Sequence, residues 1–95
     1  MTELCRAIGD RRVVRFEYGG GLRTVEPHCH GWSGAGAELL RGYQTFGYST
    51  SGESAGWKTF HVAGMAGLRM SDGGFTPRPE FRREDAAIRR VHCSV

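Results

Sequence analysis

The 95-residue chain lacks long apolar runs, and its longest uninterrupted apolar stretches span two or three residues. A membrane-spanning helix needs about 20 such residues, so no membrane partner is expected. Residues 1–4 also lack the basic start and apolar block of a signal peptide. The three cysteines are odd in number and form no CxxC pair, which argues against a disulfide scaffold. The sequence therefore predicts a cytoplasmic protein with free thiols.

Lysine is also scarce, because Lys58 stands alone beside twelve arginines. Arginine presents a flat, five-donor fork that suits phosphate and carboxylate, so this bias fits an anion-binding surface. GC-rich coding is the alternative explanation. Ten acidic residues largely offset the arginines and leave a net charge of +3, whereas a dedicated nucleic-acid binder usually carries a stronger excess. Composition alone leaves both explanations open.

The periodicity of the chain predicts a helix, five short strands and a second helix. Leu4, Ala7 and Ile8 recur at helical spacing within residues 2–9, and Thr2 can cap that helix. Alternating apolar residues separated by glycine-rich turns predict the strands. These expected strands cover residues 13–18, 22–29, 38–44, 57–62 and 65–70.

Residues 82–92 are expected to form the closing helix, since Ala86, Ile88 and Val91 would lie roughly on one side of it. Five short strands joined by tight turns suit a small barrel, and closure would remove exposed strand edges. The expected fold is therefore mainly β (α+β), with a single domain over residues 1–95. It consists of a five-stranded SH3/Sm-like barrel over residues 12–70, flanked by an N-terminal and a C-terminal helix.

Several short patterns, in order over about residues 4–75, resemble the WYL domain. The matching stretches are Leu4…Ala7-Ile8, Val14-x-Phe16-x-Tyr18, Arg23-x-Val25-x-Pro27, Leu39-x-x-Gly42-Tyr43 and Lys58-x-Phe60-x-Val62. WYL domains are bacterial Sm/SH3-like barrels found mostly in transcription regulators, defence-system proteins and some helicases. The resemblance implies a sensor or binding module, often for nucleic acid or nucleotide-like ligands, that regulates an attached or neighbouring protein. It does not imply catalysis.

The chain departs from the WYL pattern at several positions. Only Leu39 survives of the tripeptide that names the family, which would fall at residues 37–39. Lys58 stands where arginine is usual, and the basic residue expected just after that strand falls at Ala63-Gly64 and is absent. The residues before the first strand are too few for the helix-turn-helix of a typical regulator. The resemblance therefore indicates a diverged, stand-alone member.

One candidate site surrounds the Gly/Ser-rich segment 47–56. Pairing of the strands on either side of it would bring amide, hydroxyl, indole and ammonium groups to one mouth of the barrel. The group comprises Gln44, Tyr48, Ser49, Ser51, Trp57, Lys58 and His61. Trp57 could stack on a base while Lys58 meets phosphate. The alternative is that Trp57 is a core residue and the segment a solvated connection.

A second candidate group consists of Arg23, His28, Arg41 and Tyr43. Arg41 and Tyr43 share a strand face by period two, and so do His28 and His30. Adjacent strands could bring these side chains together as an anion pocket. The alternative is a set of surface arginines paired with Glu17, Glu26 or Glu38.

The tripeptide His28-Cys29-His30 raises the question of metal binding. His28 and His30 could chelate from one side of a strand, but zinc would need two further ligands. His61, or the pair His92-Cys93, could supply them only by coincidence of folding, and no recognisable ligand spacing supports this. We therefore expect no metal and no cofactor. Cys29 faces away from both histidines and no acid/base pair is evident, so no enzyme is expected.

The expected function is a non-enzymatic regulatory module of the bacterial cytoplasm. It would bind single-stranded nucleic acid or a nucleotide-like anion across the Trp57/Lys58 mouth at the barrel rim. The alternative is a protein-interaction or homodimerisation module, in which Trp32, Trp57 and Phe46 form an exposed apolar patch.

Overall fold

The computed structural model describes residues 2–49, 55–82 and 87–95. Within them lie one α-helix, α1 (Thr2–Asp10), and six antiparallel strands that form one open sheet. The strands are β1 (Arg12–Tyr18), β2 (Gly21–Trp32), β3 (Glu38–Gly47), β4 (Gly56–His61), β5 (Ala66–Gly74) and β6 (Arg90–Ser94). A short 3-10 helix, η1 (Val62–Gly64), follows β4. The expected mainly β class is confirmed.

The predicted first helix and all five predicted strands are present, close to their expected boundaries. β2, β3 and β5 run further than expected, to Trp32, Gly47 and Gly74, and β2 and β3 pair with each other along their length. α1 has nine residues, and no helix in the described residues has the length and apolar character that crossing a bilayer requires.

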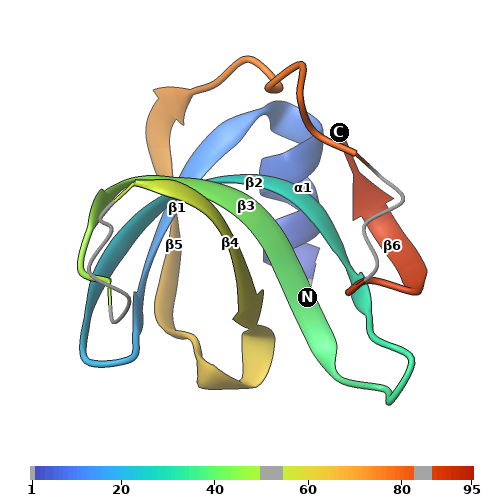
Figure 1. Cartoon of the computed structure of the whole chain (residues 1–95). Coiled ribbons are helices and arrows are strands. Elements are labelled where there is room, and N and C mark those ends of the chain that lie inside the picture. Colours follow the sequence, from blue (N-terminus) through green and yellow to red (C-terminus); the bar gives the residue numbers. More distant parts are fainter. Residues whose placement is uncertain (1, 50–54, 83–86) are drawn as a thin grey trace.

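The sheet has the order β4-β3-β2-β1-β5 and curls so that α1 lies against its concave face (Figure 1). β4 and β5 are the two ends of this order, and η1 connects them along the chain. The sheet is therefore open, and the closed barrel expected from the sequence is not what forms. Since α1 covers the concave face, the apolar side chains there are buried without closure.

The main core lies between α1 and the concave face. Its buried members are Leu4, Ala7, Ile8, Val14, Phe16, Val25, Leu40, Phe60 and Val62. The ring of Phe60 meets those of Phe16 and Tyr18 edge-to-face, with centroids 5.0 and 5.1 Å away. Each such side chain contributes about 1.5–3 kcal/mol when fully buried. The helical spacing of the apolar residues in α1 thus matches the face that it buries.

The carboxyl-terminal segment ends in a strand, which corrects the closing helix expected over residues 82–92. Residues 83–86 lie outside the described residues, and β6 pairs with β2. β1 pairs with the edge of β2 only as far as Val25. Buried backbone groups farther along that edge need hydrogen-bond partners, and β6 pairs with it from Cys29 to Trp32.

The apolar spacing that favoured a helix over residues 82–92 does not mark one buried face. Ile88 packs into a second, smaller cluster with Cys29 and Leu39. Val91, three residues later, is 39% exposed. The two residues therefore lie in different environments. The segment forms a strand because backbone groups at the edge of β2 need hydrogen-bond partners.

Candidate functional site

The predicted site residues divide between the two faces of the sheet. Successive side chains of a strand point to opposite faces, and Trp57 and Lys58 are neighbours in β4. Lys58 lies on the concave face with Phe60, whereas Trp57 lies on the convex face beside its partner Tyr43. A single mouth built from Trp57 and Lys58 therefore does not form.

On the concave side, five predicted residues form two separate sets of hydrogen bonds at the rim of the core. Arg23 is 3% exposed, and its Nη1 donates to Oε1 of Gln44 at 3.2 Å. Nε2 of Gln44 donates to the carbonyl of Tyr48 at 3.0 Å. Nζ of Lys58 donates to Oγ of Ser49 at 3.2 Å. These polar groups bond within the fold and support it, and Arg23 is not part of an anion pocket with Arg41.

On the convex side, Arg41, Tyr43 and Trp57 lie together, as period two predicts for the first two. The Tyr43 and Trp57 rings are 5.5 Å apart, and the Arg41 guanidinium lies 5.4 Å from the centre of the Trp57 ring. Phe81 stacks on Trp57 at 5.9 Å. Oε2 of Glu80 accepts the indole N–H at 3.3 Å. Trp57 is thus the centre of an aromatic and charged cluster.

His28 is fully buried beneath this cluster, 4.8 Å from the Trp57 ring. Its Nε2 accepts the backbone N–H of Arg78 at 3.1 Å, so Nδ1 carries the proton and donates to the carbonyl of Glu26 at 2.9 Å. Burial is the largest influence, and it lowers the pKa of His28 below the usual 6.5. His28 is therefore a neutral core histidine that supports the convex surface from below.

A pocket of about 220 Å³ opens beside Trp57. Its lining consists of Arg41, Trp57, Glu80, Phe81 and Arg82. Whole-ligand pockets commonly have about 300–1,000 Å³, so this one has room for a single planar ring. Two guanidinium groups beside an indole ring can combine stacking with recognition of an anion.

The segment between β5 and β6 supplies pocket residues that sequence reasoning missed. Phe81 and Arg82 line the pocket, and Arg78 places its guanidinium 3.6 Å from the centre of the Tyr43 ring. Arg78 is held by Oε1 of Glu26 at 2.8 Å, and this hydrogen bond raises its pKa. Pro77 and Pro79 indicate an extended segment in the sequence, but no signal shows which face it covers.

The two remaining predicted site residues, His61 and Ser51, lie away from the pocket or outside the described residues. His61 is exposed at the other end of β4, opposite Leu39, and Ser51 is outside the described residues.

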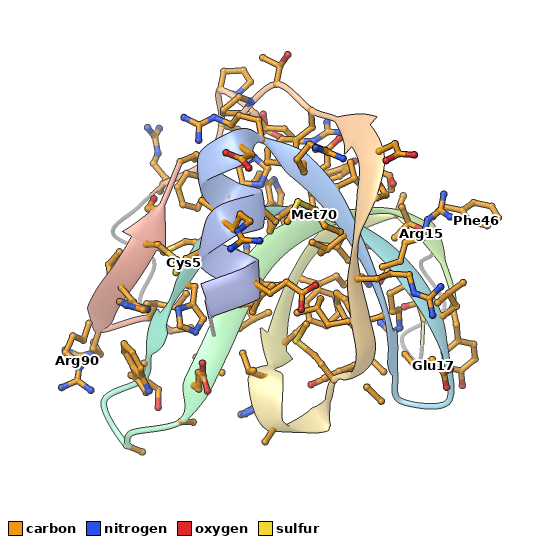
Figure 2. The ribbon with its side chains drawn as sticks, turned by 180° about the vertical axis from the view of Figure 1, so that it is seen from behind. Cys5, Arg15, Glu17, Phe46, Met70 and Arg90 are labelled. Carbon is orange, nitrogen blue, oxygen red and sulfur yellow. A yellow bond between two sulfur atoms is a disulfide. The ribbon has the colours of Figure 1, made fainter. Side chains whose placement is uncertain are left out.

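The patch expected from Trp32, Trp57 and Phe46 does not form. Phe46 pairs with Thr24 near one end of the β2–β3 hairpin and Trp32 lies at the other. In Figure 2, Phe46 and Arg90, which covers the Trp32 ring, are on opposite sides.

The cysteines and histidines depart most from expectation. Cys5 and Cys93 form a disulfide that does not include Cys29, so the prediction of three free thiols is wrong. A register shift between Pro27 and Cys29 interrupts the alternation of β2. His30 consequently faces α1 while His28 faces Trp57, and the two histidines cannot chelate from one side.

His30 instead meets residues that are distant in the sequence. Cys5, His30, His92 and Cys93 place their ligand atoms within 4.8 Å of one another and could hold a metal ion. The sequence offers the pair His92-Cys93 as ligands only in combination with both His28 and His30. No spacing motif reveals the group, because its members come from both ends and the middle of the chain.

Comparison with protein-family models, with curated proteins and with solved structures found no match for the chain. The WYL resemblance therefore stays a prediction. The geometry of the convex pocket is the basis for a functional proposal.

Proposed function

We propose that the chain is a non-enzymatic binding module that takes single-stranded nucleic acid on its convex face, with one base in the Trp57 pocket. The supporting observation is the pocket itself, where Arg41 covers Trp57 and Arg82 lies on the same lining. Stacking of a base on an aromatic side chain contributes about 1–3 kcal/mol. A guanidinium can bond a phosphate through two parallel hydrogen bonds. The WYL resemblance, which implies a regulatory module for such ligands, supports the same class.

A pair of arginines elsewhere on the convex face favours an oligonucleotide over a mononucleotide. Arg15 and Arg69 are exposed and lie directly opposite each other on β1 and β5. Like charges in this position destabilise a sheet, and a phosphate between them would relieve the repulsion. β1 is three strands from β4, or about 14 Å at about 4.8 Å per strand. A ligand that reaches both places is longer than one nucleotide.

Fluorescence anisotropy of a labelled oligonucleotide tests the proposal. Affinity should fall steeply between about 50 and 200 mM salt, as phosphate contacts require. Trp57→Ala should weaken binding by about 5- to 150-fold, the range that loss of one stacked base implies, and Arg41→Ala should reduce both affinity and the salt dependence. Trp57→Phe should retain most of the affinity.

Two further variants sharpen this experiment. Arg6 is an exposed arginine on α1, away from the convex face, so Arg6→Ala controls for loss of one positive charge and should bind normally. Lys58→Ala separates the convex pocket from the rim expected from the sequence, because Lys58 lies on the concave side. Absent binding, salt-independent binding, or a larger loss for Lys58→Ala than for Trp57→Ala would overturn the proposal.

The second candidate function is homodimerisation through exposed apolar side chains near the start of β2 and the end of β3. Leu22, Phe46 and Tyr48 are 56%, 75% and 47% exposed, and the Tyr48 N–H donates to the Leu22 carbonyl at 2.9 Å. Exposed apolar side chains that lie together often mark contacts with another protein. Light scattering should then show a dimer that ignores oligonucleotide and that Phe46→Ser converts to monomer. A monomer at all concentrations would exclude this candidate.

A further inference from the structure

We propose that Cys5, His30, His92 and Cys93 form a tetrahedral zinc site when the two cysteines are reduced. The Cys5–Cys93 disulfide is the oxidised, metal-free form of the same site. The four residues come from α1, β2 and β6, and Figure 2 shows Cys5 extending from α1 toward β6. Cys₂His₂ is one of the standard ligand sets of structural zinc.

Three separations between the ligand atoms are close to those of a zinc tetrahedron. With Zn–S of about 2.3 Å and Zn–N of about 2.05 Å, tetrahedral geometry requires N···N of about 3.4 Å and S···N of about 3.6 Å. Nδ1 of His30 and Nδ1 of His92 are 3.2 Å apart. Sγ of Cys5 lies 3.6 Å from Nδ1 of His92 and 4.0 Å from Nδ1 of His30. The two sulfur atoms must separate from bond length to about 3.8 Å, and every pair of ligand atoms already lies within 4.8 Å.

Two irregularities in the strands aim these side chains at one point. The register shift in β2 between Pro27 and Cys29 turns His30 toward α1. A second shift pairs His30 with Cys93 and Gly31 with Val91, so His92 is an extra residue in β6. Adjacent residues of a regular strand point to opposite faces, but a bulge re-aims a side chain. His92 and Cys93 can therefore approach the same centre.

His30 has a carboxylate partner, Glu38, of the kind that orients metal-binding histidines. Nε2 of His30 lies 2.6 Å from Oε2 of Glu38, so it carries a proton and donates to the carboxylate. Nδ1 of the same ring therefore presents its lone pair to Cys5 and His92. Metal-bound histidines almost always donate their other N–H in this manner. The His30 side chain is fully buried and cannot turn to solvent.

The charges and electrons of the two forms balance. Zinc with two thiolates and two neutral imidazoles has no net charge, which suits a site with a fully buried ligand. Reduction of the disulfide by two small-molecule thiols gives two cysteine thiols and one small-molecule disulfide. Zinc binding then releases the two thiol protons. In the reverse direction, a small-molecule disulfide accepts the two electrons, forms the Cys5–Cys93 bond and leaves two small thiolates and free Zn²⁺.

Titration of the reduced chain with Zn²⁺ or Co²⁺ tests the site. One ion should bind per chain in native mass spectrometry, and Co²⁺ should give the strong visible absorption of a tetrahedral complex together with thiolate-to-metal charge transfer. The oxidised chain should bind neither ion. Glu38→Gln should weaken zinc binding by about 10- to 100-fold, as loss of a histidine-orienting partner does.

His92→Ala is the decisive variant, because His92 is exposed and its loss leaves the disulfide able to form. It should fold normally when oxidised and lose tight zinc binding when reduced. His61→Ala removes another exposed histidine outside the group and should bind zinc like the unaltered chain. No zinc uptake by the reduced chain, or equal affinity in His92→Ala, would show that His92 simply donates a hydrogen bond to His30 beside a structural disulfide.

Discussion

The Arg23 guanidinium donates to the side-chain oxygen of Gln44 at 3.2 Å, and both residues are buried. Gln44→Leu would leave a buried, charged donor without this acceptor. A donor left unsatisfied in this way costs about 1–3 kcal/mol. We expect Gln44→Leu to lower the free energy of unfolding by that amount in urea denaturation.

Two comparisons test this reading of the Arg23–Gln44 pair. Arg6→Ala, at an exposed position of α1, should change the free energy of unfolding by less than about 0.5 kcal/mol. The double variant Arg23→Met/Gln44→Leu removes both partners and should be more stable than the sum of the single effects. Strict additivity would show that the two side chains do not depend on each other.

Gly31 lies where β6 passes closest to β2. A Cβ added there would overlap the carbonyl oxygen of Arg90 and come within 2.7 Å of Cγ2 of Ile88. Because the first of these atoms belongs to the backbone, no rotamer change relieves the overlap. Gly31→Ala should lower the free energy of unfolding by about 1–3 kcal/mol. In hydrogen-exchange measurements on this variant, the β6 amides should exchange faster than the amides elsewhere in the sheet.

Gly9 offers a matched control for this substitution. Nothing lies within 4 Å of a Cβ added there, and the residue belongs to α1. Gly9→Ala should therefore stabilise the chain by about 0.5–1 kcal/mol. If Gly31→Ala proved equally harmless, β6 would not be held against β2 as the structure shows.

Acid should destabilise the disulfide form of the chain through His28. The groups facing its ring from packed segments are Glu26, Arg78 and Glu80. Burial lowers its folded-state pKa below 6.5, so the unfolded chain binds the proton more readily. The contribution of neutral His28 to the free energy of unfolding is fully present above pH 6.5. It is lost as the pH falls below 6.5, with a slope of at most about 1.4 kcal/mol per pH unit. Urea denaturation between pH 7 and pH 5 measures this slope, which His28→Asn should reduce.

Local alternation was sufficient to predict the strands of residues 12–74. Val14 and Phe16 are buried while Arg15 and Glu17 are exposed, so each side chain's position follows from its place in the strand. The same rule predicts that Arg41 and Tyr43 share a face, and the structure agrees. Patterns of period two are reliable here because one face of the sheet meets α1 and the other meets mostly solvent.

The rule fails where a register shift or a distant partner decides the outcome. The irregularity after Pro27 separates His28 from His30, and no local pattern announces it. β6 forms because the β2 edge beyond Val25 is uncovered by β1, a fact that depends on two strand lengths at once. The grouping of Cys5 with Cys93 joins residues 88 positions apart, so it follows only from the assembled fold.

Because Cys5 and Cys93 lie 88 positions apart in the sequence, their disulfide should contribute strongly to the free energy of unfolding. Closing so long a loop restricts the unfolded chain, and natural disulfides typically contribute about 2–4 kcal/mol. Reduction in the presence of a chelator should lower the free energy of unfolding by this amount. Adding zinc at about 100 times its dissociation constant should restore about 2.7 kcal/mol, because the metal would rejoin α1, β2 and β6.

A chain with both cysteines changed to serine separates these contributions. Cys5→Ser/Cys93→Ser has neither the disulfide nor thiolate ligands, so its unfolding should respond neither to reductant nor to zinc. The His92→Ala chain keeps the disulfide and should lose stability on reduction, yet zinc should not restore it. If zinc stabilised the reduced His92→Ala chain as much as the unaltered one, the stabilising metal would be bound elsewhere. If reduction left the unaltered chain equally stable in chelator, the docking of β6 would not depend on the covalent link.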